Sequence, residues 1–125
     1  PVFQDGGLLT IGDCHAAMGD GEATASAVEC ALDATFRVSI AENLSLSRPV
    51  VTNENEVMTT GEGETMEAAT KMAIDAMADL MVDNLGVDYT SAAMLIASAA
   101  DVRTGLAGNP PYTMRVAIPR SMLSV

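Results

Sequence analysis

The sequence has 125 residues, of which 49% are hydrophobic, and this length and composition predict a single domain with its own core. It carries 17 Asp and Glu residues against 6 Lys and Arg, so the formal net charge is -11 at pH 7. A surface this acidic repels phosphate backbones and anionic lipid, which excludes nucleic acids and acidic membranes as expected partners. Metal cations and neutral or cationic small molecules remain as expected partners.

No apolar run reaches the roughly 18 residues of a transmembrane helix, and no charged-then-apolar leader indicates a signal peptide. The two cysteines, Cys14 and Cys30, are too few for a disulfide framework. We therefore expect a soluble, cytoplasmic protein with two reduced thiols. Because the sequence begins at Pro1, we also expect a processed subunit or a piece of something longer.

The first half of the chain is predicted to be β-structure. Residues 8–11 are a short candidate strand, and residues 28–40 alternate apolar and polar side chains, which is typical of a long strand buried on one face. Two further strands are expected at residues 49–52 and 56–60, separated by the turn Asn-Glu-Asn.

The second half changes to helical spacing. Residues 64–85 repeat apolar side chains every three or four positions and stop at Gly86, so we predict a long helix with a glycine C-cap. Residues 90–100 are small and apolar nearly all round, which predicts a second, buried helix. A last strand is expected over residues 112–118, and the elements together predict the α+β class.

Few reactive groups are available for catalysis. The single lysine, Lys71, lies inside the predicted long helix, which argues against Ser-Ser-Lys and Glu-Lys-Cys arrangements. The glycines form neither of the phosphate-binding loop patterns, so nucleotide binding is not predicted. Cys14 directly precedes His15, and adjacent side chains of an extended chain point to opposite faces, so a Cys-His nucleophile is disfavoured.

The remaining candidates lie in residues 12–22, GDCHAAMGDGE, which include the only histidine of the sequence. Asp13 and His15 are two positions apart, as are Asp20 and Glu22, and a reversal of the chain between the pairs would bring them together. One histidine with two or three carboxylates suits Zn²⁺ or a similar divalent ion and leaves positions open for water and substrate. Such an ion supports amide hydrolysis without a protein nucleophile. A polar turn without a ligand is the competing interpretation.

Three other polar residues lie near predicted elements. Glu29 is on the polar face of the predicted strand 28–40, where simple solvation is the alternative to a site role. Asp101 and Arg103 form a small cluster between the second helix and the last strand, for which a surface ion pair is the simplest interpretation.

The segment GDCHAAMGDGE followed by ASAVECALDATFRVSI resembles the acetamidase/formamidase family, whose members carry Gly-Asp-x-His-Ala-x-x-Gly-Asp-Gly-Glu before a strand with a Glu at its start. The match continues loosely through both predicted helices and SAADVRTG. The resemblance implies a metal-dependent amidase that hydrolyses a small linear amide, such as formamide or acetamide, to the acid and ammonia. It also implies a β-rich, sandwich-like core with two helices packed outside, and assembly into oligomers.

At matching positions the resemblance implies individual roles. His15, Asp13 and Glu29 are assigned to a divalent metal, with Zn²⁺ as the expected ion. Glu22 is assigned as the general base on the bound water, and Asp20 as a second catalytic carboxylate.

Two positions depart from the family pattern. Cys14 stands where the family usually has Gly, and Met18 stands where it often has Gln. We assign both residues to the substrate pocket, where a thioether in place of a polar group would alter substrate preference or weaken activity.

Family members are about twice this length or more, so the resemblance implies that residues 1–125 form a single domain equivalent to their C-terminal portion. We therefore expect a second polypeptide that carries the N-terminal half. Two alternatives stay open: a non-catalytic or regulatory subunit that keeps the family fold, and an enzyme of this fold that cleaves another carbon–nitrogen bond.

Overall fold

The computed structural model describes residues 4–42, 44 and 46–123, and the described part contains two antiparallel sheets and two α-helices. This arrangement confirms the predicted α+β class. The elements in chain order are β1 (His15–Ala17), β2 (Val28–Glu29), β3 (Val50–Thr52), β4 (Glu56–Gly63), α1 (Met66–Leu85), α2 (Tyr89–Ala99), β5 (Asp101–Leu106), β6 (Tyr112–Pro119) and the 3₁₀ turn η1 (Arg120–Met122).

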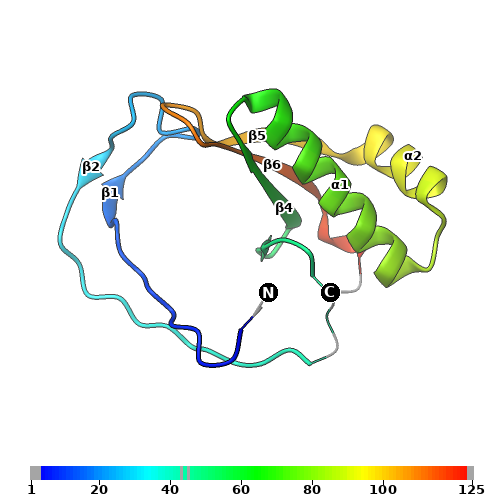
Figure 1. Ribbon diagram of the computed structural model, residues 1–125, viewed down its shortest axis with the longest axis horizontal. Coiled ribbons are helices and arrows are strands. Elements are labelled where there is room, and N and C mark those ends of the chain that lie inside the picture. The colour runs from blue at the N-terminus through cyan, green and yellow to red at the C-terminus, as the bar shows by residue number, and fades with distance from the viewer. Residues whose placement is uncertain (1–3, 43, 45, 124–125) are drawn as a thin grey trace.

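The body of the molecule, residues 46–123, is built on the four-stranded sheet with strand order β3-β4-β6-β5. Helix α1 packs against β4 and β6, and α2 packs against α1 (Figure 1). Within the described residues, every buried hydrophobic side chain lies in this body, between Val57 and Leu123. The expected pair of helices outside a β-rich core is therefore confirmed.

Helix α1 lies close to strand β4 because the residues between them are small. A Cβ added to Gly61 would lie 2.1 Å from the carbonyl oxygen of Ala69 on the helix. Beside it, the buried hydroxyl of Thr59 donates a hydrogen bond of 2.7 Å to the carbonyl of Ala73. Strand and helix thus meet backbone to backbone, which leaves little room for any larger side chain.

Most predicted elements of the body are confirmed, namely β3, β4, both helices and β6. Helix α1 ends at Gly86, as predicted, with φ at 64°. Two expectations are corrected. Residues Asp101–Leu106 form strand β5 instead of a connection. Helix α2 buries Ala92 and Ile96 but leaves Met94 exposed, because one face of it meets α1 and the rest meets solvent.

The arm, residues 4–42, forms a wide arc that extends away from both helices (Figure 1). Its strands β1 and β2 pair with each other. The predicted strand at residues 8–11 is wrong, and of residues 28–40 only Val28–Glu29 is β-structure. Among the described residues of this stretch, only Cys30 has its N–H bonded across to the neighbouring segment, at the carbonyl of Cys14. Within the described part of the chain no strand pairs with residues 31–40, so their backbone groups have no ladder partner and their apolar side chains stay exposed.

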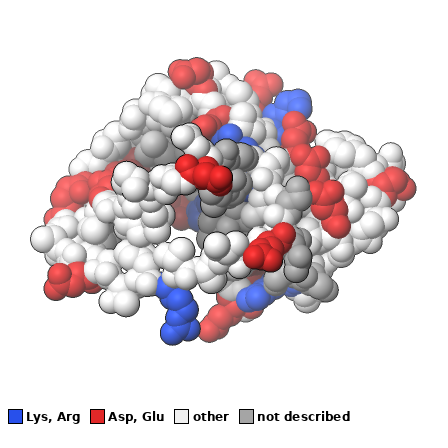
Figure 2. All heavy atoms as spheres, turned by 60° about the horizontal axis from the view of Figure 1, so that its bottom comes forward, with Lys and Arg blue, Asp and Glu red and all other residues white. Residues whose placement is uncertain are grey.

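The surface is rich in acidic side chains, as the composition predicts. Figure 2 shows Asp and Glu dispersed over the visible face instead of gathered in one patch. The charge therefore does not mark one binding surface on this face. Among the described helices, none has the length and apolar character needed to cross a membrane.

Candidate metal centre

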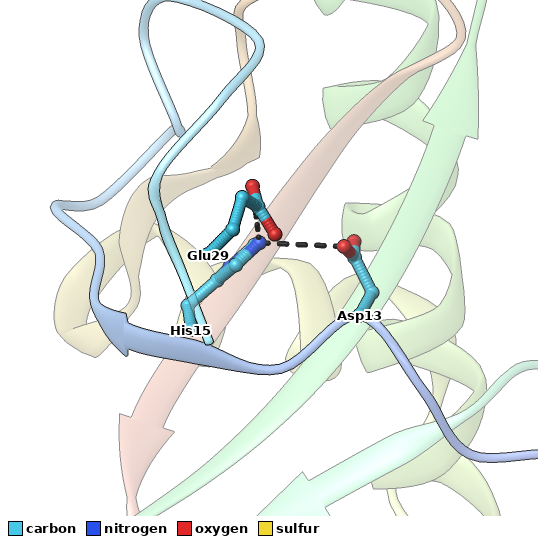
Figure 3. A group of neighbouring side chains, drawn as sticks. All are labelled: Asp13, His15 and Glu29. Atoms are coloured by element: carbon cyan, nitrogen blue, oxygen red, sulfur yellow. Dashed lines mark ion pairs between the residues drawn. The ribbon is translucent and has the colours of Figure 1, made fainter. Parts of the chain in front are cut away.

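The site lies where β1 and β2 pair. His15 is the first residue of β1, Glu29 is the last residue of β2, and the two are direct partners across the antiparallel pair. Asp13 precedes β1 on the same segment. Side chains of facing residues in an antiparallel pair are neighbours, so this short pairing brings the imidazole beside a carboxylate that is distant in the sequence (Figure 3).

Three carboxylates surround Nε2 of His15. The nearest oxygen of Glu29 is 3.1 Å away, that of Asp13 is 3.3 Å away and that of Glu22 is 4.0 Å away. The first two contacts are drawn in Figure 3. The side chains of His15 and Glu22 are 11% and 17% exposed, whereas that of Asp13 is 80% exposed. The cluster is thus a half-buried acidic site focused on one ring nitrogen.

Nε2 of His15 is buried, yet among the described residues it has no hydrogen-bond partner. A buried polar atom without a partner costs about 1–3 kcal/mol, so its position beside three oxygens favours a further ligand.

A divalent cation fits this donor set. The ligand atoms of Asp13, His15 and Glu29 all lie within 4.8 Å of one another. A tetrahedral zinc ion holds nitrogen and oxygen ligands at about 2.0–2.2 Å, which spaces neighbouring ligand atoms about 3.4 Å apart. The two shortest distances at the imidazole are close to that spacing. One imidazole with carboxylates is also a chemical combination that zinc accepts.

The backbone at two of the carboxylates is left-handed, a conformation that residues with side chains rarely adopt. The φ angle is 58° at Asp13 and 41° at Glu22. Such a conformation costs on the order of 1 kcal/mol or more for a residue other than glycine. Backbone strain therefore coincides with two residues that face His15.

The site turn, residues 19–25, carries Glu22 and is attached to the body at the β5–β6 hairpin. The carbonyl of Gly21 accepts a hydrogen bond of 2.6 Å from the N–H of Ala107. Gly108 follows, and a Cβ added there would lie 2.5 Å from the carbonyl oxygen of Glu22. The end of the hairpin therefore determines where the turn lies.

The structure does not bring every predicted site residue into the cluster. Asp20 points to the body, where its Oδ1 lies 3.0 Å from Nη2 of Arg115 on β6. Asp20, Glu22 and Met18 nevertheless line one hollow of about 610 Å³. Cys14 lies outside this lining; it is free and partly buried, and its carbonyl accepts the N–H of Cys30 at 3.0 Å.

Sequence reasoning missed Arg115. No motif marks it, and the only local signal is a charged side chain inside a mostly apolar strand. Its contact with Asp20 depends on how the arm folds back on the body, which spacing along the chain does not reveal.

The expected ion pair of Asp101 and Arg103 is confirmed, and it is part of a network that also includes Glu56. Nη2 of Arg103 lies 3.0 Å from Asp101, and the guanidinium also donates two hydrogen bonds, of 2.7 and 3.0 Å, to Glu56 on β4. The bonds from Arg103 hold the pKa of Glu56 below its ordinary value. This network lies within the body, away from His15.

The chain matches the family model described as the acetamidase/formamidase family over residues 1–124. It is similar to a solved acetamidase from Bacillus halodurans, with 30% identity, a TM-score of 0.81 and coverage of 89% of this chain and 39% of that one. It is also similar to a predicted acetamidase/formamidase from Thermoanaerobacter tengcongensis, with 25% identity, a TM-score of 0.75 and coverage of 86% of this chain and 36% of that one. An acetamidase from Yersinia enterocolitica is similar too, with 30% identity, a TM-score of 0.74 and coverage of 89% of this chain and 34% of that one. No curated protein matches it. The chain thus spans between 34% and 39% of the length of these solved chains.

Proposed function

This chain belongs to the acetamidase/formamidase family, and we propose that it supplies part of the active centre of an enzyme that hydrolyses a small linear amide to the carboxylic acid and ammonia. Formamide and acetamide are the expected substrates. The observation that carries the proposal is the buried Nε2 of His15, which lies among three carboxylates without a hydrogen bond to any described residue. Family membership supports the class of reaction, and this cluster supports its location.

In this proposal Nε2 of His15 and the carboxylates of Asp13 and Glu29 hold a divalent metal, with zinc as the first candidate. When bound, such an ion polarises an amide carbonyl and lowers the pKa of a water molecule. The chain supplies preorganised donors, because the imidazole is nearly buried and Glu29 is fixed opposite it by the β1–β2 pairing.

Glu22 is the proposed general base. Its carboxylate lies 4.0 Å from Nε2 of His15 and is outside the group of three whose ligand atoms lie within 4.8 Å of one another. It is therefore close enough to accept a proton from water beside the donor set without being needed as a donor itself. Asp20 lines the same hollow and is the proposed second catalytic carboxylate.

Substrate selection is proposed to involve the two departures from the family pattern. Met18 lines the hollow with Glu22 and presents a half-exposed thioether to it. We propose that Cys14, which directly precedes His15, also influences which amide the site accepts.

Two variants separate metal binding from chemistry. We expect His15→Ala to lower zinc affinity at least about a hundredfold, because it removes the only imidazole. Glu22→Gln should keep the zinc and slow ammonia release from formamide and acetamide at least about a hundredfold. Metal analysis and ammonia assays on the chain with its partner polypeptide measure both, and Asp101→Asn is the control carboxylate outside the cluster.

Unchanged metal content in His15→Ala would refute the ligand assignment. Full zinc binding without turnover of any amide in a substrate panel would point instead to a non-catalytic subunit that keeps the family fold.

We further propose that a second polypeptide completes the fold along the arm. The chain spans 34% to 39% of the three solved chains named above, so most of such a fold is not contained in it. Residues 30–40 offer the docking segment, because Phe36 is 55% exposed and Ile40 88% exposed and the alternation places both on one face. An extended segment with free backbone groups accepts a further strand, and its apolar side chains supply the contacts.

Native mass spectrometry of the chain isolated from its source tests this partner. We expect a complex with a larger polypeptide that Phe36→Asp releases and that Thr35→Asp, on the opposite face, leaves intact. A fully active monomer of 12.9 kDa would exclude the second polypeptide. A complex made only of copies of this chain would assign the segment to self-association.

A further inference from the structure

We propose that Arg115 is a positioning residue that fixes the site turn, residues 19–25, to the sheet and thereby holds Glu22 beside His15. The proposal rests on the proposed function, because the turn belongs to the same site. It adds to that function a residue from the far end of the chain, located on β6 in the body.

The guanidinium of Arg115 reaches two segments at once. Its Nε and Nη2 donate to the carbonyl of Thr104 on β5 at 3.1 and 2.8 Å. The same Nη2 lies 3.0 Å from Oδ1 of Asp20 in the turn. Two bonds to one fixed carbonyl set the plane of a rigid guanidinium, so its remaining donor direction is set as well. The sheet therefore fixes the orientation of the Arg115 side chain, independently of its contact with the turn.

The turn is held at two consecutive residues. Asp20 is held through its side chain by Arg115, and Gly21 is held through its carbonyl by the N–H of Ala107 at 2.6 Å. Glu22 follows directly and has φ at 41°, a conformation that persists only where the surroundings impose it. The two attachments supply that constraint, so releasing one of them lets Glu22 relax away from the imidazole.

Arg103 provides an internal comparison, because it is the direct partner of Arg115 in the β5–β6 pairing. Arg103 binds Glu56 and Asp101, which both belong to the body. Arg115 instead binds Asp20, which belongs to the arm. Two identical side chains at one level of the sheet thus have different roles: one stabilises the body internally, and the other connects the body to the site.

Amide hydrogen exchange of the metal-free full chain tests this role, with Arg115→Met as the probe and Arg103→Met as the matched control. We expect Arg115→Met to speed exchange in residues 19–25 and 104–108 about tenfold or more, and Arg103→Met to leave residues 19–25 unchanged. Ammonia release from formamide, measured on the chain with its partner polypeptide, should fall about 10- to 100-fold in Arg115→Met only, because Glu22 leaves its position. Zinc affinity should stay unchanged, because Asp13, His15 and Glu29 lie outside the turn. Arg115→Lys keeps the positive charge but loses the bidentate donor geometry of the guanidinium. It should therefore retain part of the wild-type protection from exchange and part of the wild-type ammonia release.

Normal exchange in residues 19–25 together with normal ammonia release in Arg115→Met would overturn the proposal. Equal acceleration across the body in Arg115→Met and Arg103→Met would also overturn it, since both arginines would then act only on overall stability. The exchange measurement uses metal-free protein, so it decides the role of Arg115 even if His15→Ala shows the zinc assignment to be wrong. If Arg115→Met does not fold, Arg115→Lys and Asp20→Asn provide the same comparison.

Discussion

The arm and the body show what one sequence pattern produces with and without a neighbouring strand. In the body, β4 and β6 pair along their whole length, from Glu56 opposite Pro119 to Gly63 opposite Tyr112. In the arm, residues 30–40 alternate as regularly but form no strand. Alternation therefore predicts which face would be buried, whereas a strand exists only where another segment completes its hydrogen bonds.

The hydrophobic core and the proposed metal site are also divided between these two regions. Buried hydrophobic side chains of the described residues all lie in the body, while His15 and its three carboxylates lie in the arm. The arm is connected to the body at the site turn. Substitutions in the body, at the connection and in the arm should consequently have different signatures.

The largest effect is expected inside the body, at Gly61. A Cβ there would lie 2.1 Å from the oxygen of Ala69 and 2.5 Å from the nitrogen of Ala73, both of which are backbone atoms that cannot turn aside. We expect Gly61→Ala to lower the free energy of unfolding by about 3 kcal/mol or more. Urea denaturation followed by far-UV circular dichroism measures the change.

The matched control for Gly61 is Gly12 in the arm. An added Cβ meets nothing within 4 Å there, so Gly12→Ala should change the free energy of unfolding by less than about 0.5 kcal/mol. Equal losses in the two variants would contradict the division between arm and body.

An intermediate effect is expected at the connection, for Gly108→Ala. The new Cβ would lie 2.3 Å from the nitrogen of Ala25 and 2.5 Å from the oxygen of Glu22, so the site turn must move away from the hairpin. We expect ammonia release from formamide to fall about tenfold because Glu22 moves with the turn, with a loss of only about 1 kcal/mol in the free energy of unfolding. Ammonia assays of the chain with its partner polypeptide measure the first value, and urea denaturation measures the second.

Gly19→Ala is the control for Gly108→Ala, because Gly19 lies in the site turn itself and an added Cβ there has nothing within 4 Å. Wild-type ammonia release in Gly108→Ala would show that the position of Glu22 does not depend on the hairpin.

The smallest effect is expected in the acid response of the body. The hydrogen bonds from Arg103 lower the pKa of Glu56, and the N–H of Ser91 lowers the pKa of Asp88 at the start of α2. A carboxylate whose pKa is lower in the folded state contributes stability above its ordinary pKa and loses it as pH falls through the lowered value. The melting temperature should therefore decline below about pH 4.5.

Glu56→Gln should remove part of that decline and cost little at pH 7, because the side chains of Arg103 and Glu56 remain 33% and 26% exposed to water, which screens the ion pair. Differential scanning calorimetry of both proteins over a series of pH values measures the melting temperature at each pH. A pH profile of Glu56→Gln parallel to that of the wild type would show that this carboxylate plays no part in the acid response.

The body was largely predictable because its signals are local. Thr65 accepts a hydrogen bond from the N–H of Ala68 at the start of α1 and Gly86 ends the helix, and both residues are visible in the sequence. Strand β5 was missed because Asp101–Leu106 mixes charged, small and apolar residues without clear alternation, and its pairing with β6 creates the strand.

The site was predictable only in part, for the same reason. The two-residue spacing of Asp13 and His15 correctly implied that they lie together. The position of Glu29 opposite His15 depends on the β1–β2 register, and the attachment of Asp20 depends on Arg115. Both are contacts between distant segments, and a single sequence contains no distances of that kind.

The left-handed backbone at Asp13 and Glu22 bears on how the sequence tolerates substitution. Glycine adopts that conformation without the steric penalty that a side chain brings. A variant library screened for heat resistance alone should enrich glycine at positions 13 and 22, whereas a library screened for amide turnover should retain the acids. Such a difference between the two libraries would show that the acids at positions 13 and 22 are selected for amide turnover and not for stability.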